Sequence, residues 1–292
     1  MFMKHRVQEI APDALRRYMA DRAERDYVLI DVRQPQEYEQ EHLPGAVLIS
    51  VSELEGKLGT LNPEQDHIFY CRSGARSMAA AMLAEDSRLL RGQVFSLQGG
   101  ILAWGGGALA DYPRVDVFSG IDSIRGMLLK ALELEKAAHE LYRQVRAVVK
   151  RDVMCDLMDT LIGVEIAHAR VVYSYLGKYW NDGSQPIPPF ETMFDALQGK
   201  VLEGGLTVDE LQPWIRGAAQ GDCLELADLA LEVEMNAYDL YRTLARNAAQ
   251  GDVPGFALGK DAEPVFLDLA TQEKHHTRLI MSRIRAFEET GA

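Results

Sequence analysis

The sequence predicts two domains, an α/β domain with a largely parallel sheet followed by an all-α four-helix bundle. Short apolar runs alternate with helical patterns over residues 12–97, and long helical periodicity dominates from residue 121 onward. Between them lies the Gly-rich stretch 104–120, which Pro113 interrupts. A chain of 292 residues suits two domains, because single cores usually stop growing near this size. We expect domains over 1–112 and 122–292, joined by a linker over 113–121.

The composition is that of an ordinary soluble globular protein, with 47% hydrophobic and 26% charged residues. A formal net charge of −13 argues against a nucleic-acid partner and against a polybasic membrane contact, since both need clustered Lys and Arg. The N-terminal MFMKHRVQEIAPD has no long apolar run, so we expect no signal peptide. The three cysteines are widely spaced and odd in number, which is not typical of a disulfide framework. We therefore expect a cytoplasmic protein.

In the first domain, four β-branched apolar runs bounded by turn residues predict buried strands at 27–32, 46–51, 67–71 and 94–97. Helical patterns fall between them, at 12–23, 51–61 and 75–85. In such an alternating fold the ligand site lies at the carboxyl ends of the strands. Cys71 stands at one of these ends, directly before a predicted helix.

In the second domain, 3.6-residue periodicity predicts four long helices at 122–148, 153–179, 222–248 and 262–288. Asp152 is a plausible N-cap of the second helix. The long crossover 180–221 contains a Thr207–Glu210 capping box, so we expect one or two short helices there.

Cys71 has the surroundings of a reactive thiol. A helix N-terminus stabilises a thiolate, Arg72 and Arg76 add positive charge, and the intervening residues Ser73, Gly74 and Ala75 form a tight turn. The alternative is an inert core cysteine, which is common. Two flanking arginines make that alternative poorer, because an apolar pocket disfavours them.

Three motifs appear in order in the first domain: LIDVRQPQEYEQEHLPGAVLIS (29–50), IFYCRSGARSMAAAMLAE (68–85) and VFSLQGGILAW (94–104). In these motifs the domain resembles a single-domain rhodanese. The resemblance implies that Cys71 accepts sulfur from a small donor, holds it as a persulfide and passes it to a thiol acceptor. Arg72, Arg76 and the amides of the loop would steady the anionic groups, and the remaining polar residues of the motifs, Asp31, Arg33 and Glu37, would shape the site.

A Cys-based phosphatase is the main rival for such a loop. That class uses Cys-x5-Arg to surround a phosphate, whereas here the arginine comes one position early, at Arg76. A loop one residue shorter favours sulfur transfer over phosphoryl transfer.

The second domain contains a duplicated pattern of ionisable residues. Glu165/His168 and Glu273/His276 are two Glu-x-x-His pairs, each on one helical face. The other two helices repeat a Glu-x-x-Ala-x-x-x-Tyr pattern, at Glu135 to Tyr142 and at Glu234 to Tyr241. In each antiparallel hairpin the two glutamates are equidistant from the predicted turn, at residues 149–153 or 251–255, so all four should lie at one level. Four buried glutamates without a partner would be costly, and two metal ions held by carboxylates and imidazoles are the natural compensation.

Over residues 118–292 the domain resembles the rubrerythrin and ferritin-like family. The resemblance implies two iron ions, with manganese as the alternative, bridged by Glu165 and Glu273. Its other implied ligands are Glu135, Glu234, His168 and His276, with Tyr142, Tyr241, Glu232 and His275 close behind them. It also implies a homodimer. No haem is expected, and the chain has no Cys-x-x-Cys, so a rubredoxin-type four-cysteine iron site is not expected either. Cys155 and Cys223 fit core positions better than ligand positions.

These observations favour a sulfurtransferase fused to a non-haem di-iron domain that uses O2 or peroxide, in sulfide or persulfide handling. The alternative is a sulfur-carrying or sensing module attached to a structural or metal-storage bundle. A third hypothesis is that the Cys71 domain only binds and does not turn over.

Overall fold

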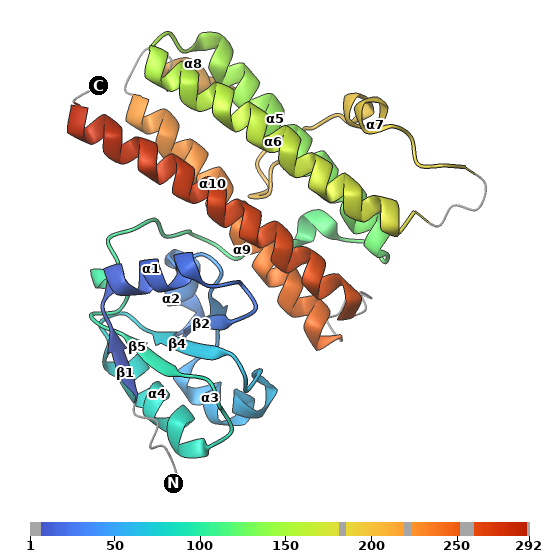
Figure 1. The fold of residues 1–292 in the computed structure, drawn as a ribbon. Coiled ribbons are helices and arrows are strands. Elements are labelled where there is room, and N and C mark those ends of the chain that lie inside the picture. The colour runs from blue at the N-terminus through green and yellow to red at the C-terminus, as the bar shows by residue number, and fades with distance from the viewer. Residues whose placement is uncertain (1–6, 181–184, 219–222, 252–259, 291–292) are drawn as a thin grey trace. The chain divides into compact units, whose positions relative to one another are not determined.

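The computed structural model describes residues 7–180, 185–218, 223–251 and 260–290, and it divides the chain into two compact units. The first unit is Met1–Tyr112 and the second is Pro113–Ala292 (Figure 1). None of the helices in the described ranges is both long enough and apolar enough to cross a bilayer.

The first unit is built on a five-stranded parallel sheet of order β1-β5-β4-β2-β3. Its strands are β1 Gln8–Ile10, β2 Tyr27–Asp31, β3 Val47–Leu48, β4 Asp66–Tyr70 and β5 Val94–Leu97. Four match predicted runs, but β3 keeps only two residues because a helix already begins at Val51. The fifth, β1, was not predicted, since three residues beside Pro12 carry too little periodicity.

Helices cover both faces of the sheet (Figure 1). They are α1 Pro12–Asp21, α2 Pro35–Gln40, α3 Val51–Lys57, continued by a 3-10 turn over Leu58–Thr60, and α4 Ala75–Ser87. Leu15 of α1 and Tyr38 of α2 pack on one face, whereas Leu54 of α3 and Ala80 of α4 pack on the other. Burial on both faces explains why the strands are continuous apolar runs. The short α2 was not predicted, and a capping box between Gln34 and Glu37 starts it.

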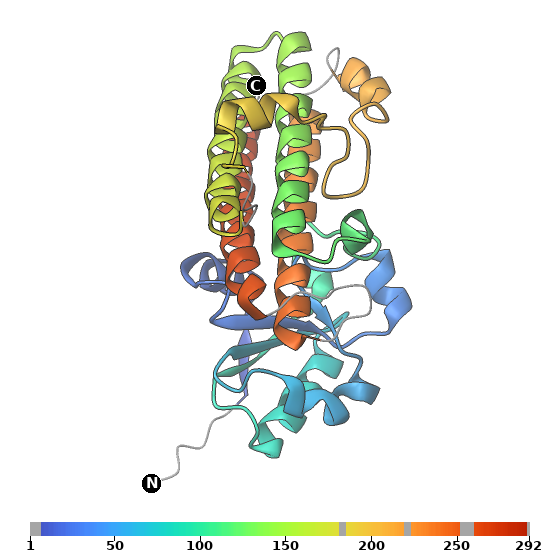
Figure 2. The same ribbon diagram turned by 90° about the vertical axis from the view of Figure 1, so that its right-hand side faces the viewer.

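The second unit has four long helices, α5 Ile124–Val148, α6 Asp152–Lys178, α9 Cys223–Gln250 and α10 Glu263–Thr290. Two short helices, α7 Phe190–Ala196 and α8 Gln212–Ala218, lie in the crossover, as predicted. In the second unit α5 packs along α6, α9 packs along α10, and α10 also contacts α6 (Figure 2). The N-cap of α6 is Arg151 rather than Asp152, which is the first helical residue, where a carboxylate still favours the helix dipole. The turn predicted at 251–255 falls outside the described residues beyond Gly251.

The segment predicted as a linker belongs to the second unit. Val115–Phe118 forms a 3-10 helix, and the Phe118 side chain is 0% exposed. It joins the apolar cluster that contains Met127 of α5 and Tyr238 of α9. The helical unit therefore begins at Pro113, and its first element packs into the core.

Replacing Phe118 tests this assignment. Phe118→Ala should lower the free energy of unfolding of the helical unit by about 3–5 kcal/mol, because it empties a fully buried aromatic site. Urea unfolding followed by far-UV circular dichroism measures the change. Val153→Ala on α6, where the side chain is 43% exposed, is the control and should change the value by no more than about 0.5 kcal/mol. A Phe118→Ala effect as small as the control's would make 113–121 a linker after all.

Candidate functional site

Cys71 lies where the central strand of the first unit ends. Strand β4, between β2 and β5 in the sheet, ends at Tyr70, and α4 begins at Ala75. Gly74 is the N-cap of α4 with φ +101°, a left-handed conformation that favours glycine. The turn 71–74 thus aims the first amides of α4 back at the thiol, at the carboxyl edge of the sheet where the sequence predicted a site.

The Cys71 thiol is enclosed by hydrogen-bond donors. Gly74 N–H donates to Sγ over 3.1 Å. Burial raises the pKa of the thiol, but the N–H and hydroxyl of Ser77 and the N–H groups of Gly74 and Ser73 outweigh burial, so the pKa is lowered overall. Cys71 itself is 1% exposed, whereas Arg72, Ser73 and Ala75 on the rim are exposed. The loop therefore surrounds the sulfur with a cup of donors that favours the thiolate form.

The two arginines of the Cys71 loop, Arg72 and Arg76, have different surroundings. Arg76 forms a two-pronged ion pair with Glu37 of α2, with Nη1–Oε2 and Nη2–Oε1 distances of 2.7 and 2.6 Å. The pair lowers the pKa of Glu37 to about 2. Arg72 stays exposed on the rim. Arg76 thus ties the loop to α2, and Arg72 is the arginine of the loop available to an incoming anion.

The buried pair Asp31–Arg33 supports the carboxyl edge beside β4. Arg33 Nη2 donates to Asp31 Oδ2 over 2.7 Å, and both side chains are almost fully buried. The Arg33 guanidinium also lies over the Tyr70 ring, 5.6 Å from its centroid. The pair thus packs against the last residue of β4, directly before Cys71, and the role predicted for Asp31 and Arg33 in shaping the site stays a prediction.

The Gly-Gly motif after β5 lets a second loop pack against the Cys71 loop. Ile101 N–H donates to the Cys71 carbonyl over 2.8 Å. A Cβ on Gly100 would lie 2.3 Å from that carbonyl oxygen, and Gly100 has φ +60°. Only glycine fits at position 100, and this explains the second glycine of the Gly-Gly motif.

In the helical unit, the structure brings the six predicted ligand residues together. All six are buried, with exposures of 1–6%. They come from four helices: Glu135 of α5, Glu165 and His168 of α6, Glu234 of α9, and Glu273 and His276 of α10. The equal heights inferred from the hairpin turns are therefore found in the structure.

Glu273 lies between the two imidazoles. Its Oε1 is 2.9 Å from His168 Nδ1, and its Oε2 is 3.1 Å from His276 Nδ1. His168 Nδ1 also lies 3.0 Å from Glu135 Oε2, and His276 Nδ1 lies 2.9 Å from Glu234 Oε2. Glu165 Oε1 is 3.7 Å from His276 Nδ1. His168 thus lies between Glu135 and Glu273, and His276 lies between Glu234 and Glu273, so the two imidazoles share Glu273.

The two predicted tyrosines complete a reciprocal arrangement. Tyr142 of α5 donates its hydroxyl to Glu234 of α9, and Tyr241 of α9 donates to Glu135 of α5 over 3.2 Å. Each tyrosine therefore orients the glutamate of the other helix, Tyr142 acting on Glu234 and Tyr241 on Glu135. The duplication noticed in the sequence is a two-fold relation of contacts.

Burial and the close contacts between ionisable groups shift the pKa values of the cluster strongly. Burial lowers the pKa of His168, but Glu135 and Glu273 raise it to about 10. The same balance, with Glu234 and Glu273, raises the pKa of His276 to about 12. Burial and the neighbouring carboxylates hold the pKa of Glu165 well above its usual range. Without another cation, the cluster is balanced only by protonated imidazoles and protonated carboxyls.

The donor set fits a pair of iron or manganese ions. Three overlapping groups each bring three ligand atoms within 4.8 Å of one another: Glu165–His168–His276, Glu135–His168–Glu273 and Glu234–Glu273–His276. Among the described residues, Glu165 Oε1 and His168 Nε2 are buried without a hydrogen-bond partner. Carboxylate oxygens and imidazole nitrogens are the ligands these metals take. A cation would satisfy the orphaned atoms.

The remaining predicted residues lie elsewhere, and one was missed. Glu232 and His275 are exposed on α9 and α10, so neither faces the cluster. Cys155 is half-buried and accompanies an apolar cluster, and the Cys223 side chain is outside the described residues. The missed residue is Glu203 in the crossover, which is 3% exposed and raised in pKa by burial and by Glu135 and Glu273. Glu203 lies in a Gly-rich turn, where the sequence has no helical or strand periodicity from which burial could be predicted.

Comparison with known proteins identifies relatives of the first unit. A family model described as a rhodanese-like domain matches residues 12–106. A sulfurtransferase of Allochromatium vinosum is 35% identical over 99 residues, which are 34% of this chain and 88% of that protein. A putative sulfurtransferase of Bacillus subtilis, YtwF, is 31% identical over 100 residues, 34% of this chain and 92% of its own. A crystal structure of a rhodanese-related protein from Thermoplasma volcanium is 24% identical and covers 36% of this chain and 99% of its own, with a TM-score of 0.31.

The donors around Cys71 predict a pH dependence. The pKa of the thiol lies below the ordinary 9.0, so alkylation by iodoacetamide should reach half its maximum below that pH. Ser77→Ala removes the hydroxyl and should move the midpoint upward, whereas Ser73→Ala keeps the backbone N–H and should leave it in place. Ser96→Ala, which removes only the hydroxyl partner of Ser77, separates a loop distortion from the direct effect. Equal midpoints in wild type and Ser77→Ala would contradict the assignment.

Proposed function

The chain belongs to the rhodanese-like family through residues 12–106, and from that premise we propose that Cys71 carries sulfane sulfur as a persulfide. The observation that carries the proposal is the cup of N–H donors that lowers the pKa of the Cys71 thiol. A thiolate is the nucleophile in sulfur chemistry, and the same donors stabilise the anionic persulfide that follows.

The reaction consists of two displacements. The Cys71 thiolate attacks the outer sulfur of a donor such as thiosulfate, a sulfur–sulfur bond forms, and sulfite leaves with the electron pair of the broken bond. An acceptor thiolate then attacks the outer sulfur of the persulfide, and Cys71 leaves again as the thiolate. No external oxidant or reductant is needed, because sulfur passes from one nucleophile to another.

The residues of the rim have separate tasks in this scheme. Arg72, exposed beside the thiol, attracts the anionic donor. Arg76 holds the loop to Glu37 and so keeps the amides aimed at the sulfur. The compact loop of Cys71 to Arg76 leaves no extra residue for surrounding a phosphoryl group, which supports sulfur transfer over phosphatase chemistry.

Loading with thiosulfate tests the sulfur step. Intact-mass spectrometry should find one added sulfur atom on the wild-type chain and on Cys155→Ser, but none on Cys71→Ser. Failure of the wild type to load, with thiosulfate and with a persulfide donor, would instead support a binding module without turnover.

We also propose that the second unit is a ferritin-like bundle whose buried cluster holds two metal ions, iron or manganese. Glu165 and Glu273 would lie between the ions, with Glu135 and His168 on one and Glu234 and His276 on the other. The orphaned oxygen of Glu165 and the three overlapping donor groups support this proposal. When bound, such a pair supplies redox chemistry with O2 or peroxide.

The protein's own groups prepare this site. Tyr142 and Tyr241 fix one oxygen each of Glu234 and Glu135, which leaves the other oxygen for a metal. The apolar residues packed around the cluster exclude water. The presence of both units in one chain favours a role in sulfide or persulfide handling. A structural or metal-storage bundle is the alternative, and metal-loaded protein that consumes neither O2 nor peroxide would favour it.

Metal content tests the second half of the proposal. Elemental analysis of protein purified without chelators should find about two iron or manganese ions per chain. Glu273→Gln should lose most of both, because Glu273 contacts both imidazoles. Glu232→Gln, at an exposed position of the same unit, is the matched control and should keep both. Wild-type protein from iron-replete cells with no metal would overturn the proposed centre.

A further inference from the structure

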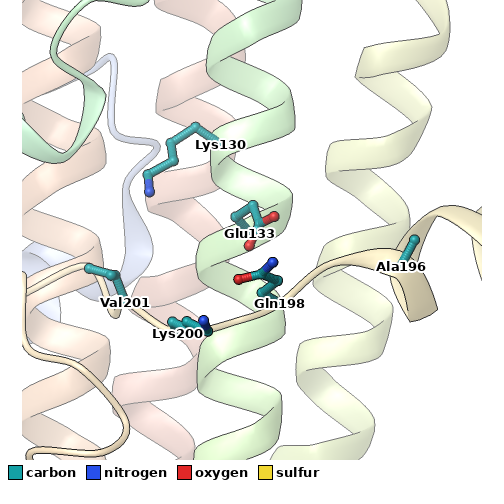
Figure 3. Close-up of a pocket in the computed structure, with 6 residues that line it drawn as sticks. All are labelled: Lys130, Glu133, Ala196, Gln198, Lys200 and Val201. Carbon is teal, nitrogen blue, oxygen red and sulfur yellow. The ribbon is translucent and has the colours of Figure 1, made fainter.

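The crossover between α7 and α8 contains a strap, residues 197–206, that crosses α5 beside the cluster. Figure 3 shows its first part passing Glu133 of α5. Gly199 N–H donates to Glu133 Oε2 over 3.2 Å. A Cβ on Gly199, which has φ +57°, would lie 2.8 Å from the Lys136 carbonyl carbon. The strap therefore lies directly on the backbone of α5, next to Glu135.

The strap then forms a tight turn that reaches α9. Gly205 N–H donates to the Leu202 carbonyl over 2.8 Å, and Leu202 N–H donates to the Leu206 carbonyl over 2.9 Å. Leu202 is buried in the apolar cluster that includes Tyr142. A Cβ on Gly204 would lie 3.3 Å from the Asn236 side chain, two residues after Glu234. Glu203, at the tip of the turn, thus lies between the helices that carry Glu135 and Glu234.

The Glu203 carboxyl is buried without compensation. Glu203 is 3% exposed, and its Oε2 atom has no hydrogen-bond partner among the described residues. A buried acid whose oxygen lacks a partner is costly unless a cation completes its surroundings.

We infer that Glu203 is a further protein ligand of the metal pair, supplied by the strap. The inference rests on the proposed metal centre. The strap contacts α5 at Glu133 and Lys136, on either side of Glu135, and α9 at Asn236, two residues after Glu234, which places Glu203 between the helices that carry these two glutamates. A carboxylate oxygen is a suitable ligand for iron and manganese.

A consequence is that metal binding fastens the strap. The strap crosses from α5 to α9, so a bond from Glu203 to an ion of the pair ties the crossover to the long helices whose side chains hold that ion. Binding energy at a metal is available for ordering the segment that supplies the ligand.

The experiment is a titration of metal-free full-length protein with Mn²⁺, followed by calorimetry. Wild type should bind two ions. Glu203→Gln should bind one of them about 10–100-fold more weakly and the other unchanged. Glu232→Gln is the matched control and should behave as wild type. Hydrogen exchange of residues 197–206 should slow on adding Mn²⁺ to wild type and slow less in Glu203→Gln.

The outcomes separate this inference from the metal centre itself. No Mn²⁺ binding by wild type would overturn both. Two ions with equal affinities and equal protection of the strap in wild type and Glu203→Gln would overturn the role of Glu203 alone. Metal-free Glu203→Gln should be at least as stable as metal-free wild type, because it removes a buried acid. A marked loss of stability in that metal-free variant would show a structural role and overturn the inference.

Discussion

The helical unit is organised around one buried layer of charge. Four glutamates and two histidines, contributed by all four long helices, are buried close together in the core. The layer separates two apolar clusters, so that along α5 Leu134 belongs to one and Ala137 to the other, with Glu135 between them. Along α10, Ala270 and Ile280 are divided in the same way by Glu273 and His276. Charged groups in the core reduce the apolar area that the helices bury, and their desolvation costs free energy. The stability of the fold therefore depends on the groups that neutralise these carboxylates.

The first unit stabilises its anion by other means. Around Cys71 the donors are backbone N–H groups at the start of α4, held in place by the left-handed Gly74 and by the close approach of Gly100. The Arg76 guanidinium of the same loop is paired with Glu37. In the proposed sulfur transfer, the same dipoles would favour negative charge first on the thiolate and then on the persulfide. A carrier that alternates between the two states is served well by such a cup.

Much of this was predictable, and the exceptions have physical causes. Strands buried on both faces and helices with an apolar stripe have strong periodicity, so β2, β4, β5 and the four long helices appear close to the predicted bounds. The repeated spacing in the sequence also predicts that Glu135, Glu165, Glu234 and Glu273 lie at one height. Elements of a few residues, such as β1 and α2, offer too little periodicity. The burial of Phe118 and the turn that carries Glu203 depend on contacts between distant segments, which no local pattern encodes.

The buried cluster combines a duplicated set of ligand residues with one residue, Glu203, that is not duplicated. The reciprocal bonds from Tyr142 to Glu234 and from Tyr241 to Glu135 make the two ends of the cluster equivalent. Glu203 comes from the crossover between the two hairpins, an element that occurs once, and among the described residues it has no counterpart beside Glu234 and His276. As a further ligand, Glu203 would make the position that it joins more negative and would favour a more highly charged ion there. The strap would then convert a symmetric pair of positions into two unequal ones, and ions at unequal positions differ in affinity and in the ease with which each is oxidised.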